Sequence, residues 1–287
     1  MKEFFLKSLS KSQNSSTKEV NAILKQKNKI IASDDIDFGQ LWEWGDYGLK
    51  ETSRVETNTK KVIQTELAKK RFLEAYYIEK AGMTFAAKMS LLSESIEEQK
   101  LFSHFAAEEA AHFSLIESLL TKVDKREGQD LFIKFLNEVI ASGERRPLIF
   151  IIQVVLEGWG IDHYGIMERT CKEAEVKQHL KLILKDEASH HGSGVSLFKE
   201  SDLSESELNY TMEMMGEFIK MARVGPVNLF ETFKKHTKIS ASEFCEVSNA
   251  QQETQRKLNY LKNLMQKAGA KKMTQGLEPL FKPDLVI

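Results

Sequence analysis

Two Glu-x-x-His tetrapeptides, each preceded by a single Glu at the same distance, constrain this chain more than any other feature. The tetrapeptides are Glu109–His112 and Glu187–His190, and the upstream residues are Glu79 and Glu157. The upstream Glu stands 30 residues before its tetrapeptide in both cases (79 to 109, 157 to 187), and the set recurs after 78 residues (79 to 157). Residues three apart share one face of an α-helix. Each tetrapeptide therefore predicts a carboxylate and an imidazole side by side.

Four carboxylates and two imidazoles at duplicated helical spacing predict a buried site for two metal ions. Hard carboxylate oxygens with one nitrogen per metal suit iron or manganese better than zinc, which takes fewer and softer ligands. Four Glu charges also balance two divalent cations, whereas the same carboxylates without metal repel one another and take up protons. Solvent-exposed helix faces are the alternative, but they do not explain the matched upstream residues inside apolar stretches. The predicted ligands are Glu79, Glu109, His112, Glu157, Glu187 and His190.

The composition favours an all-α fold. The chain has 287 residues, 41% of them hydrophobic, with only 4 Pro and 15 Gly, and helix-forming residues dominate. The pattern predicts long helices over residues 57–90, 96–121, 147–171 and 176–200. Because about 13 helical residues cover roughly 20 Å, each 30-residue spacing allows the chain to leave the ligand level, turn and return to it. We therefore expect an antiparallel four-helix bundle.

The remaining residues flank this bundle. Residues 1–56 are expected to form a polar arm followed by an aromatic segment, in which Trp42, Trp44 and Tyr47 serve as a cover or simply as a hydrophobic plug. Residues 57–200 form the bundle, and residues 201–287 form a C-terminal helical extension. One helix is expected near Met212–Met221 and a last one over Ser242–Lys267. The three segments are expected to make one compact domain.

Charge and cysteine content exclude several classes of protein. A net charge of −1 gives no general attraction to nucleic acid or to an anionic membrane. The most apolar run, Pro147–Leu156, is shorter than the roughly 20 residues that span a bilayer. Cys171 and Cys245 stand far apart, which excludes a cysteine-rich iron or zinc module and fits a reducing compartment. The segment Met1–Lys7 is too charged for a signal peptide, so a cytoplasmic location is expected.

The six predicted ligands, taken in order, resemble the ferritin-like di-iron carboxylate proteins, which share this ligand pattern. The resemblance covers residues 79–190. The superfamily includes ferritins, rubrerythrins, ribonucleotide reductase small subunits, acyl-carrier-protein desaturases, tRNA hydroxylases and arylamine or aldehyde oxygenases. Both tetrapeptides also follow an acid, Glu108 and Asp186, as in the desaturases and reductase small subunits. The resemblance implies that these acids orient the ligand imidazoles by hydrogen bonding, although Glu108 could equally be an exposed charge.

The resemblance implies an oxidase or oxygenase that uses two iron ions, or iron with manganese, to activate dioxygen and oxidise a small organic substrate. Because no flavin, haem or iron–sulfur motif is visible, the electrons would come from a ferredoxin, a reductase or the substrate. The alternatives are a ferroxidase or peroxide-scavenging protein, a radical-generating subunit and a helical scaffold with a degenerate site. Bundles of this kind often pair along a helix face, so a homodimer is a further expectation.

Several residues near the ligands are candidates for supporting roles. Tyr164 follows Glu157 after two helical turns, where a phenol could hydrogen-bond near the metals or carry a radical, or simply fill the core. Gly160 and Gly194 lie one turn after ligands and serve either close helix packing or room for dioxygen and substrate. His191 follows a ligand but points about 100° away from it, and is therefore expected not to bind metal.

Overall fold

The computed structural model describes residues 2–3, 20, 36–120, 123–124 and 131–283. Every regular element in these ranges is helical, and one isolated antiparallel bridge joins Leu49 to Ser248. The predicted all-α class is therefore confirmed for the described part of the chain. The polar arm predicted over residues 1–32 falls almost wholly outside the described residues. None of the helices in the described ranges is long and apolar enough to cross a membrane.

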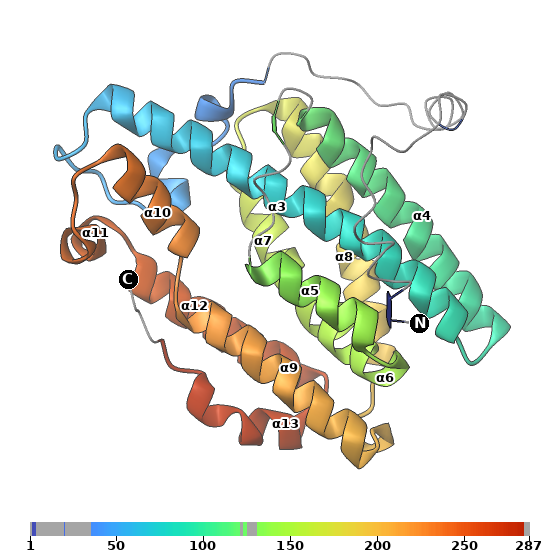
Figure 1. Cartoon of the computed structure of the whole chain (residues 1–287). Coiled ribbons are helices and arrows are strands. Elements are labelled where there is room, and N and C mark those ends of the chain that lie inside the picture. The colour runs from blue at the N-terminus through green and yellow to red at the C-terminus, as the bar shows by residue number, and fades with distance from the viewer. Residues whose placement is uncertain (1, 4–19, 21–35, 121–122, 125–130, 284–287) are drawn as a thin grey trace. The chain divides into compact units, whose positions relative to one another are not determined.

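The four long helices predicted from the sequence are present, with small changes at their ends (Figure 1). The main helices in chain order are α3 (Thr57–Leu92), α4 (Ile96–Leu119), α5 (Leu131–Ser142), α6 (Arg145–Leu148), α7 (Glu157–Thr170), α8 (Ala174–Leu197), α9 (Glu205–Arg223), α10 (Val227–His236), α11 (Ala241–Val247), α12 (Ala250–Lys267) and α13 (Lys271–Gly276). A π-helical segment, η5 (Ile149–Leu156), joins α6 to α7. The short 3-10 helices are η2 (Phe38–Gln40), η3 (Trp44–Tyr47), η6 (Glu200–Asp202) and η7 (Glu278–Leu280).

The chain divides into two compact units. The first unit contains residues 1–36 and 69–145, and the second contains residues 37–68 and 146–287, so the division falls within α3. Each unit therefore holds one upstream Glu and one tetrapeptide of the duplicated motif. The aromatic segment belongs to the second unit from Asp37 onward.

In the first unit, α3 and α4 form an antiparallel helical hairpin. Ser95 caps α4 by accepting a hydrogen bond from the Glu98 amide, which ends the short turn after α3. Aromatic contacts then join the two helices at successive levels: Phe85 meets Phe102 edge-on at 6.2 Å between ring centroids, and Tyr76 meets Phe113 at 4.8 Å. The hairpin thereby brings the middle of α3 opposite the middle of α4.

A buried lysine fixes α5 against this hairpin. The Lys88 ammonium on α3 donates hydrogen bonds to the carbonyls of Ile140, Ala141 and Gly143, at 2.8, 3.3 and 2.6 Å. These carbonyls end α5 and have no donor within the helix. Burial lowers the pKa of Lys88, and Glu144 partly opposes that shift. Lys88 therefore serves as the C-terminal cap of a helix that is distant in sequence.

In the second unit, α7 and α8 pack along their length as a second antiparallel pair. Residues 145–170 form a continuous helical run, in line with the single helix predicted from Pro147 to Cys171. The π-helical character of η5 was not predicted. Helices α9 and α12 pack on η5, and α12 also contacts α7. The helical run that carries Glu157 is thus covered by helices of the C-terminal extension.

The aromatic segment packs into the second unit. The indole of Trp42 donates to the Met167 carbonyl near the end of α7, at 3.0 Å. The Trp44 ring lies 5.7 Å from the ring of Phe233 on α10. All three predicted aromatic residues, Trp42, Trp44 and Tyr47, are buried. These contacts correspond to the hydrophobic-plug alternative.

The prediction of one helix over Ser242–Lys267 is wrong, because the chain breaks at Ser248 and Asn249 into α11 and α12. The Lys50 amide donates to the Val247 carbonyl at 2.8 Å, and the Asn249 amide donates to the Gly48 carbonyl at 2.7 Å. These two bonds make a strand-like contact that replaces the helical hydrogen bonds at the break. The competing partner comes from almost 200 residues earlier, so local helix propensity did not reveal it.

Candidate metal centre

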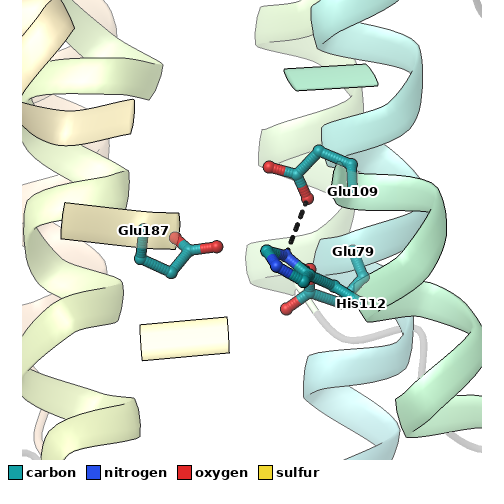
Figure 2. A group of neighbouring side chains, drawn as sticks. All are labelled: Glu79, Glu109, His112 and Glu187. Carbon is teal, nitrogen blue, oxygen red and sulfur yellow. Dashed lines mark ion pairs between the residues drawn. The ribbon is translucent and has the colours of Figure 1, made fainter. Parts of the chain in front are cut away.

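The first unit brings three of the predicted ligands together. Glu79 projects from the middle of α3, and Glu109 and His112 project from one face of α4 toward it (Figure 2). One ligand atom from each residue lies within 4.8 Å of the other two. All three side chains are buried, with Glu79 only 1% exposed. We call Glu79, Glu109 and His112 the first triad.

The second unit brings the other three ligands together. Glu157 begins α7, and Glu187 and His190 share one face of α8. Their ligand atoms also lie within 4.8 Å of one another. Glu187 and His190 are buried, whereas the Glu157 side chain is 10% exposed. We call these residues the second triad.

Distances within each triad suit a shared cation better than direct hydrogen bonds. His112 Nδ1 lies 3.4 Å from Glu79 Oε2 and 3.9 Å from Glu109 Oε2, and His190 Nδ1 lies 3.9 Å from Glu157 Oε2. Direct hydrogen bonds between these atoms would measure about 2.7–3.2 Å. Two ligand atoms bound to one ion through bonds of about 2.1 Å stand roughly 3–4 Å apart. Both imidazoles turn Nδ1 toward the upstream Glu, so Nδ1 is the coordinating nitrogen that the geometry favours.

A glycine adjoins the ligand carboxylate in each triad. Gly82 follows Glu79 by one turn, and a Cβ placed there would lie 2.5 Å from Glu109 Oε2. Gly160 follows Glu157 by one turn, and a Cβ placed there would lie 3.5 Å from Glu187 Oε2. The sequence-based prediction included Gly160 but missed Gly82. The 78-residue offset that relates the ligands also relates these two glycines (82 to 160), and would have identified Gly82.

Gly194 and Gly160, the two glycines predicted to have a role near the second triad, differ in their surroundings. At Gly194 a Cβ would approach Gln153 Cβ to 2.5 Å and the Val154 nitrogen to 3.2 Å. The glycine therefore allows α8 to pack tightly against η5, which is the close-packing alternative for this position. At Gly160 the Glu187 carboxylate is the sole neighbour within 4 Å among the atoms compared. Gly160 is therefore much less crowded than Gly194.

Other predicted residues lie near the triads but outside the clustered ligand atoms. Glu108 on α4 and Asp186 on α8 are half-buried, and each precedes a ligand by one residue. Tyr164 is buried on α7, two turns from Glu157, and its ring meets that of His163 at 5.8 Å. The orienting role of the two acids and the redox role of Tyr164 stay predictions.

Helix α12 supports α7 beside the second triad. The Tyr260 hydroxyl donates to the Gly158 carbonyl at 2.9 Å, directly after Glu157. Burial raises the pKa of Tyr260, and the charge of Asp162 raises it further, so the phenol keeps the proton that it donates. Arg256 on α12 makes two hydrogen bonds of 2.9 Å to Asp162, which ties the same two helices one turn further along. Sequence spacing gave no sign of these contacts.

No protein-family model, curated protein or solved structure matches the chain. The residues themselves must therefore indicate what the triads bind. Each triad offers two carboxylates and one imidazole in a buried setting, which is compatible with a carboxylate metal site. The donor set, the spacing of the ligand atoms and the tight fit of the first triad's carboxylate against Gly82 all agree with a bound cation.

Proposed function

We propose that the two triads form one centre for two metal ions and that the protein is an oxygen-activating oxidase or oxygenase. The observation that carries the proposal is the pair of buried Glu2His triads, both with ligand atoms at the spacing of a shared ion. Joining the triads gives four carboxylate charges for two divalent cations, so the metal-loaded centre is neutral apart from exogenous ligands. With three protein residues to hold each ion, coordination positions would be left for dioxygen or water.

The same ligand order supports a ferritin-like four-helix bundle. The two hairpins, α3 with α4 and α7 with α8, each supply one lone Glu and one Glu-x-x-His, which is the ligand arrangement of the di-iron carboxylate bundles. Iron, or iron with manganese, suits the oxygen-rich donor set. The C-terminal extension and the aromatic plug add far more chain than a bare metal-storing bundle requires, which supports an enzyme with a covered substrate site.

When bound, the metals would supply the activation of dioxygen for oxidation of a small organic substrate. The residues of the chain would hold the ions, exclude water and shape the space for the substrate. A Cβ at Gly160 would have the Glu187 carboxylate, at 3.5 Å, as its one neighbour within 4 Å, and we assign this uncrowded position to the substrate side. Tyr164 would hydrogen-bond or transfer an electron near the centre, and Glu108 and Asp186 would orient the imidazoles. An external donor such as a ferredoxin or reductase would supply electrons.

Metal content and oxygen reactivity test this proposal. Purified protein loaded anaerobically with ferrous iron should retain two ions per chain, and Glu109→Ala and His190→Ala should each reduce that number. Exposure to oxygen should produce a transient absorption, followed by a covalent change in an organic metabolite that mass spectrometry detects. Mineral formation with stoichiometric iron oxidation would instead indicate a ferroxidase. Failure of the wild-type protein to bind iron or manganese would refute the proposal.

A further inference from the structure

The helix that leads into Glu157 is irregular. Residues 149–156 form the π-helix η5, and the Glu157 amide donates to the Ile152 carbonyl, five residues back. Where a π-helix returns to an α-helix, the bonding step shortens from five residues to four, so the backbone hydrogen bonds at the end of η5 are irregular. Buried carbonyls need a partner. A donor from outside the helix can therefore stabilise the end of η5.

His191 on α8 supplies such a donor. Its Nδ1 lies 3.0 Å from the Val154 carbonyl, which belongs to the last turn of η5. A carbonyl oxygen can only accept, so Nδ1 carries the hydrogen in this contact. Gly158 leaves the room that the ring needs, because a Cβ at that position would lie 3.0 Å from His191 Nδ1. The contact thus depends on an imidazole on α8 and a glycine on α7.

The neighbouring residues of α8 hold the same segment. The side-chain amide of Gln153 donates to the Ser193 hydroxyl at 3.2 Å, and that hydroxyl donates to the His190 backbone carbonyl at 2.7 Å. Gly194 packs against the backbone of Gln153 and Val154. The turn of α8 after His190 therefore contacts and hydrogen-bonds the π-helical turn before Glu157.

The first unit contains a corresponding contact with different chemistry. The 78-residue offset relates His191 to position 113 and Val154 to position 76 (191 − 78 = 113, 154 − 78 = 76). Phe113 and Tyr76 occupy these positions, and their rings pack at 4.8 Å in the hairpin of α3 and α4. Helix α3 is an α-helix at this point, without a π-helical turn. In both units, the helix that carries the upstream Glu therefore contacts the helix that carries the tetrapeptide at this position. In the first unit the contact is between two aromatic rings, and in the second unit it is a hydrogen bond.

From these contacts we infer that His191 is a positioning residue for the metal centre. By holding the Val154 carbonyl it fixes the last turn of η5, and that turn sets the position of the Glu157 carboxylate relative to His190. The inference rests on the proposed function, because it assigns His191 to the support of one of the two metal ions. Removal of the partners that orient a metal ligand typically costs about 10–100-fold in metal affinity.

Three variants separate the hydrogen bond from the ring. His191→Phe keeps a ring of similar size, which the corresponding Phe113 shows to be compatible with such a helix pair, but it removes the donor. His191→Asn places an amide N–H close to the position of Nδ1 and restores a donor. His179→Phe is the matched control, since His179 is a buried histidine on the same helix, about three turns away from His190. Titration of each metal-free protein with Co²⁺, followed by visible absorption and by metal analysis, measures the affinity and the number of ions bound.

We expect His191→Phe to weaken one of the two ions by about 10–100-fold and to leave the other unchanged. His191→Asn should recover most of the loss, and His179→Phe should bind as the wild type does. Equal affinities for wild type and His191→Phe would overturn the inference, as would an equal loss in His179→Phe or no recovery in His191→Asn.

A second measurement does not depend on metal. Hydrogen exchange of the amides of residues 154–160 in the metal-free protein should be faster in His191→Phe than in the wild type and slower again in His191→Asn. Unchanged exchange would show that His191 does not hold this segment. If the wild type binds no metal, the proposed function fails, and the exchange rates alone decide whether His191 positions Glu157.

Discussion

Gly82→Ala tests whether the first triad is built around a bound ion. The added Cβ would lie 2.5 Å from Glu109 Oε2 and 2.8 Å from its Cδ, far inside van der Waals contact. In the metal-free protein the carboxylate ends a flexible side chain and can rotate away at little cost. The substitution also replaces a helical Gly by Ala, which favours the folded state by up to about 1 kcal/mol. Metal-free Gly82→Ala should therefore be as stable as the wild type or slightly more stable.

The cost appears when a metal ion holds the carboxylate in place. The overlap must then be relieved by shifts in the helices or by a distorted ligand, and overpacking of this kind costs about 1–3 kcal/mol. Because each 1.4 kcal/mol corresponds to a factor of ten, metal binding should weaken by about 5- to 150-fold. Gly82→Ala is thus expected to lower the metal affinity while it maintains or raises the free energy of unfolding of the metal-free protein. A general loss of structure would lower both.

Gly160→Ala provides the matched control, since it occupies the corresponding position in the second unit. Its Cβ would lie 3.5 Å from Glu187 Oε2, an ordinary contact, so metal affinity should change by less than about threefold. Co²⁺ titration gives the affinities, and urea unfolding of the metal-free proteins gives the free energies of unfolding. The reasoning is refuted if Gly82→Ala binds metal as tightly as the wild type, or if Gly160→Ala loses as much affinity.

Three further outcomes follow from the same contacts. Removal of metal by a chelator should lower the midpoint of thermal unfolding. An ion that binds only the folded state, at a free concentration 100 times its dissociation constant, stabilises that state by about 2.7 kcal/mol. An unchanged midpoint would contradict a bound metal. Lys88→Met should lower the free energy of unfolding by about 3 kcal/mol in urea titrations, because three buried carbonyls lose a charged donor, and a loss below about 1 kcal/mol would contradict the capping role. Burial, assisted by Glu117 and Tyr77, raises the pKa of Tyr76 to about 12. The stabilisation from its protonated form is full below pH 10 and is lost as the pH rises toward 12, so unfolding free energy should fall more steeply over that range in the wild type than in Tyr76→Phe.

The clustering of the six Glu and His side chains within the two hairpins could be predicted because it is set by local periodicity and by duplication. An interval of three residues places a Glu and a His on one helical face whatever the tertiary structure. The upstream Glu also stands 30 residues before its tetrapeptide in both halves, which indicates that the helices of the two hairpins extend equally far from the clustered residues to the turn. The same comparison could have identified Gly82, which the analysis of single positions passed over. Ser95 and Ser204 cap α4 and α9 by accepting hydrogen bonds from amides of the first turns, a role that serine favours directly before a helix.

The π-helical segment and the helix break at Ser248 could not be predicted, for different physical reasons. Residues 149–156 are apolar apart from Gln153, so no polar face marks the period, and a bonding step of five residues looks the same as one of four. The break at Ser248 depends on backbone bonds to Gly48 and Lys50, which local propensity does not contain. Hydrophobic periodicity shows which face of a helix is exposed to solvent. The π-helical segment and the break at Ser248 both depend on contacts of buried residues, which periodicity does not show.

The duplication preserves the six predicted ligand residues but not the residues around them. Tyr164 corresponds to Ala86, His191 to Phe113, and the π-helix to a regular turn of α3. Glu157 is more exposed than its counterpart Glu79. A Cβ at Gly160 would make an ordinary contact with the Glu187 carboxylate, whereas a Cβ at Gly82 would overlap the Glu109 carboxylate. A repeat that served only to hold two ions would gain nothing from such divergence. Substitutions that alter the choice of substrate, rather than metal content, are therefore expected around Glu157 and Gly160, and those that alter metal content alone around Glu79 and Gly82.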